Sequence, residues 1–218
     1  MIDEQTDKSR SSFWKELPIL LGVALLVAIL VRTFVLQTFY IPSPSMEHTL
    51  NVYDRVLVNK LVYNFRDPQR GEIIVFEAPE GWRSTPKGED FIKRIIGVGG
   101  DHIICCDAQG RIQVNGASLD EPYVYTENGV QDPPASTEFD IVVPADRLWV
   151  MGDHRSQSGD SLEHWTTTGE IDKSTISEDA VVGRASCSSG RSGVRTGSPR
   201  RTRSSRYRPA VAAEGLLG

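Results

Sequence analysis

The hydrophobic pattern divides the chain into one uncharged apolar run followed by many short, alternating segments. The run extends from Leu17 to Val31 and contains no charged residue. It is shorter than the roughly 20 residues that a helix needs to cross a bilayer, but apolar and aromatic residues lengthen it on both sides. Arg32 stands near its end, where a long side chain can reach the lipid headgroups. We expect residues 17–36 to form a transmembrane anchor.

Basic residues on the flanks of the run predict its orientation. Three of them precede it, from Lys8 to Lys15, and after Arg32 none occurs before Arg55. This bias places residues 1–16 in the cytoplasm and everything after about residue 36 outside. The alternatives are a cleaved signal peptide, against which the lack of a small-x-small cleavage site argues, and a buried core helix.

Beyond the apolar run, the pattern predicts an all-β exported domain. Short β-branched segments broken by Gly, Pro, Asp and Asn fill residues 50–150, and none sustains a helical period over three turns. We expect coiled sheets or a partly open barrel over residues 37–185, with a smaller β insertion at about residues 101–147.

Charge is distributed unevenly along the chain. Residues 1–183 carry 16 Lys and Arg against 28 Asp and Glu, whereas residues 184–218 carry eight arginines against the single acid Glu214. An acidic body gives no support to nucleic-acid binding, so we expect no nucleic-acid partner.

The chain contains three cysteines, two of them adjacent in a strand pattern. Neighbouring side chains on a strand point to opposite faces, so we do not expect Cys105 and Cys106 to bond to each other. Burial of one of them, or a disulfide from either to Cys187, stays open.

Two serines stand beside prolines just past the apolar run, in "IPSPSMEHTL", residues 41–50. Pro44 has a fixed φ, and each proline disfavours the helical region for the residue before it. We therefore expect a stiff, extended segment that holds the hydroxyls of Ser43 and Ser45 at a fixed spacing. A hydroxyl is a poor nucleophile until a base removes its proton, so a base is needed nearby.

Histidine is the usual base, but the histidines of this chain lie in polar or turn-like stretches. None has metal-ligand spacing with another His or Cys, which predicts no metal site. We interpret each as a surface or hydrogen-bonded residue: His48, His102, His154 and His164.

Lys93 is the alternative base. In "DFIKRIIGV" it shares one strand face with Phe91 and Ile95. Burial in such an apolar setting lowers a lysine pKa, so that a neutral amine exists near working pH. A solvent-facing lysine on an edge strand is the other interpretation, and spacing alone does not separate the two.

A polar stretch, "MGDHRSQSGDS", follows an apolar strand and supplies partners for such a lysine. A buried amine needs hydrogen-bond acceptors and a buried guanidinium needs a carboxylate. Ser158 is placed to hold Lys93, and Asp160 to pair with Arg94.

Four motifs follow the apolar run in order: "IPSPSM", "RGEIIVF", "DFIKRIIGVGGD" and "MGDHRSQSGDS". Together they resemble bacterial type I signal peptidases, over roughly residues 17–183. The resemblance implies a serine endopeptidase of the plasma membrane with a Ser/Lys dyad, a single membrane span and no cofactor. It implies cleavage of signal peptides after a small-x-small motif such as Ala-x-Ala, on the outer side of the membrane. The implied partners are exported pre-proteins, the lipid bilayer and the export machinery.

The resemblance also assigns roles to individual residues. Ser45 is the nucleophile, and Lys93 is the general base that later acts as an acid. Ser43 supplies a hydroxyl to the oxyanion hole beside the backbone N–H of Ser45.

Supporting roles fall on three further residues. Ser158 orients the lysine, and Asp160 and Arg94 form a structural ion pair. Leu162 stands where the family has an arginine, so we expect a thinner ion-pair network here. Six residues match the lining of the family's shallow apolar cleft: Phe39, Ile41, Pro42, Met46, Leu50 and Ile92.

Two other classes of function are alternatives to this interpretation. A self-cleaving repressor uses the same dyad but carries a DNA-binding domain in place of an anchor. A catalytically impaired, anchored binding protein on the same scaffold is the main alternative, and the intact dyad argues against it.

The last part of the chain departs from the family pattern. Residues 186–218 are dominated by Arg, Ser and Gly, a composition that buries too little apolar surface to fold, so we expect a disordered tail. One hypothesis is a basic tail that attracts anionic lipid headgroups. The other is a reading-frame error near codon 185, which we favour because the change falls inside an apparent strand.

Overall fold

The structure is a computed structural model that describes residues 6–83 and 88–186, without the side chains of residues 6–15 and 33–34. The tail for which disorder was predicted therefore lies outside the described residues from position 187 onward.

Helix α1, Thr6–Phe34, contains the apolar run and has Pro18 inside it. From Ile19 to Val31 its large apolar side chains are exposed. Within the parts of the chain described here, no helix combines the length and the apolar character that a bilayer span requires. The chain passes from α1 through Val35, whose carbonyl accepts a hydrogen bond from the Lys60 N–H, into the first strand.

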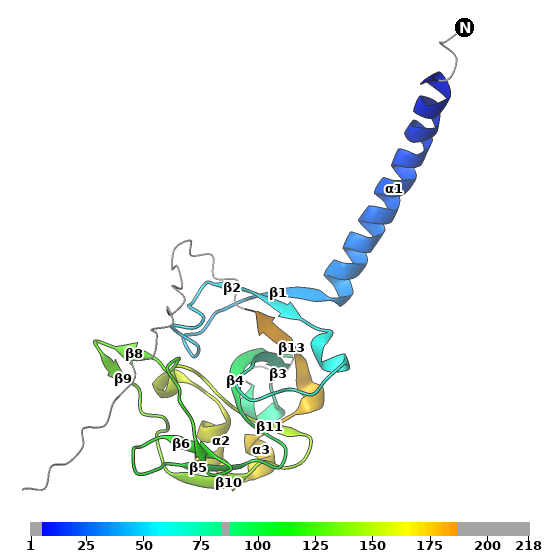
Figure 1. Ribbon diagram of the computed structural model, residues 1–218. Helices are drawn as coiled ribbons and strands as arrows, with labels where there is room; N and C mark the ends of the chain where they lie inside the picture. The colour runs from blue at the N-terminus through cyan, green and yellow to red at the C-terminus, as the bar shows by residue number, and fades with distance from the viewer. Residues whose placement is uncertain (1–5, 84–87, 187–218) are drawn as a thin grey trace, which may run out of the picture. The chain divides into compact units, whose positions relative to one another are not determined.

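A seven-stranded sheet forms the body of the domain, and all of its pairings are antiparallel. Figure 1 shows that this sheet curls strongly, with β13 between β2 and β3. In spatial order its strands are β1 (Leu36–Tyr40), β2 (Arg55–Asn59), β13 (Val181–Ser186), β3 (Ile73–Glu77), β4 (Asp90–Val98), β11 (Arg147–Met151) and β12 (Ile176–Ser177).

A smaller sheet lies in sequence between β4 and β11. An Asn-Gly turn joins two of its strands, with Asn115 at φ 53° and Gly116 at φ 79°, the geometry that two-residue hairpins favour. Its strands, in spatial order, are β10 (Phe139–Val142), β5 (His102–Cys105), β6 (Ile112–Val114) and β7 (Ala117–Ser118), and a separate hairpin pairs β8 (Thr126–Glu127) with β9 (Val130–Gln131).

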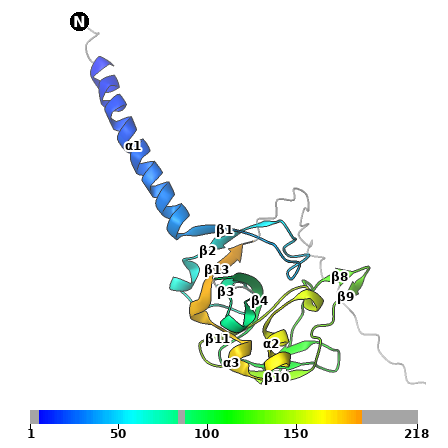
Figure 2. The same cartoon turned by 180° about the vertical axis from the view of Figure 1, so that it is seen from behind.

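The domain is mostly β rather than all-β, which corrects the prediction from sequence. Helix α2, Ser161–Thr168, packs Leu162 into the apolar cluster of β11, and α3, Ile171–Ser174, lies beside it (Figure 2). Both helices are short and mostly polar, so the hydrophobic pattern carries little signal for them. Short 3₁₀ helices complete the described fold: η1 (Val62–Asn64), η2 (Glu80–Trp82), η3 (Arg155–Gln157) and η4 (Glu178–Ala180).

Three apolar clusters hold these elements together. One packs the small sheet against Trp149 and Met151 of β11. A second fills the curl between β3, β4, β11 and β12. The third lies under the loop that carries the two serines and is built around Met46, which is fully buried.

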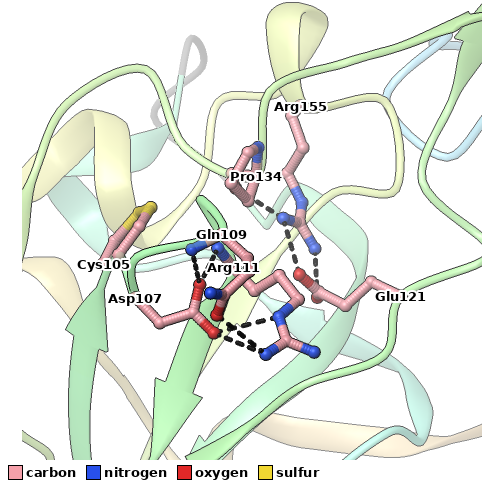
Figure 3. Close-up of a disulfide and its surroundings, with 8 residues drawn as sticks. Cys105, Asp107, Gln109, Arg111, Glu121, Pro134 and Arg155 are labelled. Carbon is pink, nitrogen blue, oxygen red and sulfur yellow. Dashed lines mark hydrogen bonds and ion pairs between the residues drawn. A yellow bond between two sulfur atoms is a disulfide. The ribbon is translucent and has the colours of Figure 1, made fainter. Parts of the chain in front are cut away.

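The structure joins Cys105 to Cys106 by a disulfide, contrary to the expectation that these neighbours stay unbonded. The expectation failed because β5 ends at Cys105, so the strand alternation does not extend to Cys106. Figure 3 shows this disulfide near the Asp107 turn, whose carboxylate accepts hydrogen bonds from the N–H groups of Gln109 and Arg111.

Candidate active site

The two serines lie on a loop that is tied together at its base. The Ile41 N–H donates to the Asp54 carbonyl, and the Tyr53 N–H donates to the Ile41 carbonyl. Ser45 is 4% exposed, and its hydroxyl lies 3.4 Å from that of Ser43. The loop therefore brings both hydroxyls to one place.

The segment is not extended throughout, which corrects another expectation. The Glu47 N–H donates to the Pro44 carbonyl at 2.9 Å, so a turn begins at Pro44 and carries Ser45. The fixed φ of proline suits a turn as well as an extended chain, and for this reason the sequence alone did not separate the two.

Lys93 lies on β4, which is an interior strand between β3 and β11. It is 4% exposed, and its Nζ lies 6.0 Å from the centre of the Phe91 ring. Burial lowers its pKa from 10.5 to about 8, against the opposing effects of the carboxylates of Asp160, Glu163 and Asp153. A large fraction of neutral amine is therefore present at mildly alkaline pH, as a general base requires.

Gly152 brings the serine loop and the lysine strand together. A Cβ placed on Gly152 would lie 2.5 Å from the Ser45 carbonyl oxygen and 2.3 Å from the Ser158 hydroxyl. The neighbouring residue Met151 pairs with Arg94 on β4. Because the two strands are antiparallel, continuing this register by one residue sets Gly152 opposite Lys93. The close approach of these segments depends on the missing side chain of this glycine.

Ser158 follows η3 and has a buried hydroxyl. This hydroxyl has no hydrogen-bond partner among the described residues. Ser158 also lines a cavity of about 400 Å³ together with Met151, Asp160 and Leu162. Its assignment as the residue that orients Lys93 stays a prediction.

Arg94 pairs with Asp153 and not with Asp160, which corrects the predicted ion pair. Its guanidinium donates to both carboxylate oxygens of Asp153, at 2.8 Å and 2.6 Å. Asp160 instead accepts from the N–H groups of Gly152 and Leu162, the second of which lies in the first turn of α2. Asp160 is thus occupied as a helix cap, a role that its position before α2 indicates once that helix is known.

No role beside the serine loop was predicted for Asp153 and His154, which both contact it. The N–H of His154 donates to the Ser45 carbonyl at 3.1 Å, and His154 is 3% exposed, so of the two interpretations, surface or hydrogen-bonded, the second is confirmed. Thr49 donates a hydrogen bond to the buried carboxylate of Asp153. The available signal was that Asp153 and His154 closely follow an apolar strand, with Gly152 between.

The residues predicted to line a cleft divide into two groups. Ile41, Met46, Leu50 and Ile92 are buried in one apolar cluster beneath the loop. Phe39 packs partly exposed against that cluster, and Pro42 is exposed. The four buried residues support the loop from below, while the lining of a cleft by all six stays a prediction.

A serine on a constrained turn close to a buried lysine strand defines a candidate site for a serine hydrolase with a lysine base. The family model described as signal peptidase, peptidase S26, matches residues 14–189. A probable signal peptidase I-2 of Synechocystis is 40% identical over 168 residues, which cover 75% of this chain and 73% of that protein. A probable signal peptidase I of Mycobacterium leprae is 34% identical over 222 residues, covering 82% of this chain and 76% of that protein.

Among solved structures, a signal peptidase I from Enterococcus faecalis matches with a TM-score of 0.40 at 25% identity, covering 55% of this chain and 97% of that one. The family model and the curated relatives cover most of the chain. The chain therefore belongs to the signal peptidase family, peptidase S26, and is a serine endopeptidase of the signal peptidase I type.

Proposed function

We propose that this peptidase removes signal peptides from exported pre-proteins, with Ser45 as nucleophile and Lys93 as general base. The observation that carries the proposal is a lysine that is almost completely buried on an interior strand, with its pKa lowered to about 8 by burial. A structural lysine on a sheet normally reaches solvent, because burying an unpaired ammonium is costly.

The proposed reaction has two halves. Neutral Lys93 takes the Ser45 hydroxyl proton as the oxygen attacks the scissile carbonyl carbon, and the Ser43 hydroxyl and the Ser45 N–H stabilise the oxyanion. The Lys93 ammonium then protonates the leaving amine, which leaves an ester on Ser45. Lys93 next takes a proton from water, which attacks the ester, and then returns this proton to the Ser45 oxygen as the acyl–oxygen bond breaks and the signal peptide leaves.

We also propose that residues 17–36 anchor the enzyme in the plasma membrane as a single span, with the N-terminus in the cytoplasm. The uncharged run, its exposed apolar side chains on α1 and the basic residues before it support this topology. The anchor would hold the site at the membrane surface, where pre-proteins leave the export machinery.

The test is to incubate the detergent-solubilised full chain with a precursor that carries an Ala-x-Ala site and to map the new N-terminus by mass spectrometry. We expect one cut directly after the second alanine, and no cut in a control precursor with leucine at that position. An intact precursor that nevertheless binds to the protein would favour the alternative, an impaired binding protein.

A further inference from the structure

His154 contacts both peptide groups that flank the nucleophile. Its backbone N–H donates to the Ser45 carbonyl at 3.1 Å. Its ring Nδ1 lies 3.2 Å from the Pro44 carbonyl oxygen. The Pro44 carbonyl and the Ser45 N–H belong to the same peptide group. His154 therefore contacts the oxygen of the peptide group whose N–H is the proposed oxyanion-hole donor.

The groups around Nδ1 indicate that this ring nitrogen carries a hydrogen. Among the described residues, the polar groups found beside Nδ1 are the Pro44 carbonyl oxygen and the Glu47 carboxylate, whose Oε2 lies 3.3 Å away. Both are acceptors, so Nδ1 carries a hydrogen whether the ring is neutral or charged. The ring therefore donates toward the nucleophile's own peptide group.

The imidazole is held firmly in this position. Its ring stacks on that of Tyr125 at 3.8 Å between centres and 14° between planes, and the Tyr125 N–H donates to the Asp153 carbonyl. His154 is also 3% exposed. Because the ring cannot rotate freely, its N–H keeps a fixed direction toward Pro44.

The Pro44 carbonyl accepts a second hydrogen bond, from the Glu47 N–H at 2.9 Å. At the other end of the same peptide group, the Ser45 N–H has no acceptor among the residues that the structure describes. Donors at the oxygen of a peptide group polarise it and make its N–H a stronger donor.

We propose that His154 is a positioning residue for the oxyanion hole: through the Pro44 carbonyl, it aims and polarises the Ser45 N–H. The inference rests on the proposed function, because it concerns how the oxyanion of that reaction is stabilised. The contacts of His154 at this loop are to the carbonyl oxygens of Pro44 and Ser45, which do not react, so its role is to position the donor.

Two substitutions separate the hydrogen bond from the packing. His154→Phe keeps a ring for Tyr125 but has no donor, whereas His154→Asn loses the ring but offers an amide N–H near the position of Nδ1. We expect His154→Phe to lower kcat about tenfold, less than the 10²–10³ of a direct donor, with KM within about twofold. We expect His154→Asn to stay within about threefold of the wild type. Should His154→Phe not fold, His154→Ala takes its place with the same expectation as for Phe.

A second readout isolates the oxyanion. A peptide aldehyde forms a tetrahedral adduct with Ser45 whose oxygen occupies the hole, whereas the matching peptide alcohol does not. His154→Phe should weaken binding of the aldehyde about tenfold and leave the alcohol unchanged. Equal weakening of both ligands, or an Asn variant as impaired as Phe, would overturn the inference in favour of a general structural role.

Glu47→Gln is the matched control, because it removes the negative charge beside Nδ1 and keeps the backbone donor to Pro44. We expect near wild-type kcat, and a loss equal to that of His154→Phe would assign the effect to the ion pair with Glu47 and overturn the inference. Cleavage by the wild-type enzyme tests the proposed function separately, since an inactive wild type fails before any variant is compared.

Discussion

Arg94 forms a bidentate ion pair with Asp153, in which Nε donates to Oδ1 at 2.8 Å and Nη2 donates to Oδ2 at 2.6 Å. Asp153 is fully buried, and the guanidinium carbon lies 3.8 Å from the centre of the Tyr123 ring. Thr49 of the serine loop donates to the same carboxylate. The pair therefore connects the strand that carries Lys93 with the loop that carries Ser45.

Asp153→Asn should destabilise the protein strongly, because it leaves a mostly buried guanidinium without its carboxylate. Breaking one side of a buried pair costs about 3–5 kcal/mol, which urea unfolding measures. Lys173→Met is the control, since its partner Glu170 and the lysine itself are both exposed, and we expect a loss below about 0.5 kcal/mol. Similar losses of unfolding free energy in the two variants would contradict the conclusion that the buried Arg94–Asp153 pair is important for stability.

Gly152→Ala should inactivate the enzyme, because the new methyl group would lie within 2.5 Å of Ser45 and Ser158 atoms. A shift of about 1 Å at a reacting group costs about 10²-fold in rate. Gly81→Ala serves as the control, since no atom lies within 4 Å of its added Cβ. Kinetic measurements on both variants check the prediction, and near-normal turnover by Gly152→Ala would show that the two segments need not lie so close.

The dyad predicts a pattern among four substitutions. Ser45→Ala and Lys93→Ala should abolish cleavage, and Lys93→Arg should be equally inactive because a guanidinium stays protonated. Ser43→Ala should retain slow cleavage, about 10²–10³-fold below the wild type, as for the loss of one oxyanion donor. Precursor cleavage followed on gels measures all four. Normal turnover by either Lys93 variant would be incompatible with a lysine base.

Lys93→Met should stabilise the fold while abolishing activity. Since burial lowers the pKa of Lys93 from 10.5 to about 8, the unfolded chain holds this proton more tightly between those two pH values. The free energy of unfolding therefore rises with pH through that window, and below about pH 8 the full cost applies, about 3 kcal/mol.

The methionine variant lacks this dependence, so its advantage over the wild type should be largest at pH 7 and vanish above pH 10.5. Urea unfolding at a series of pH values measures it. Lys173→Met, at an exposed position, should follow the wild-type curve. A Lys93→Met variant less stable than the wild type at pH 7 would show that the ammonium is well accommodated.

The sequence predicted the β-rich character because period-two alternation of buried and exposed residues is present in strands such as β2 and β10. It did not predict α2, whose eight residues are mostly polar and contribute Leu162 and Ser161 to the buried interior. Local pattern carries little signal for a helix that is held by the apolar contacts of Leu162 and Trp165 and by one capping carboxylate.

The candidate site likewise contains features that the sequence could not decide and one that was wrongly predicted from it. The burial of Lys93 was left open by spacing, and it follows from the interior place of β4, which only the strand order reveals. The partner of Arg94 was wrongly predicted because Asp153 and Asp160 are both acidic residues of one polar stretch. Only the course of that stretch shows which carboxylate reaches the guanidinium and which caps α2.

The most direct test of a lysine base is the pH dependence of kcat/KM for the wild type, His48→Gln and His154→Asn. In the proposed mechanism neutral Lys93 is the active form, so activity should rise with pH along a limb centred near its pKa of about 8. We predict that this limb persists at the same pH in both histidine variants. A limb near pH 6.5 that disappears in either of them would identify histidine as the base and contradict the Ser45–Lys93 dyad.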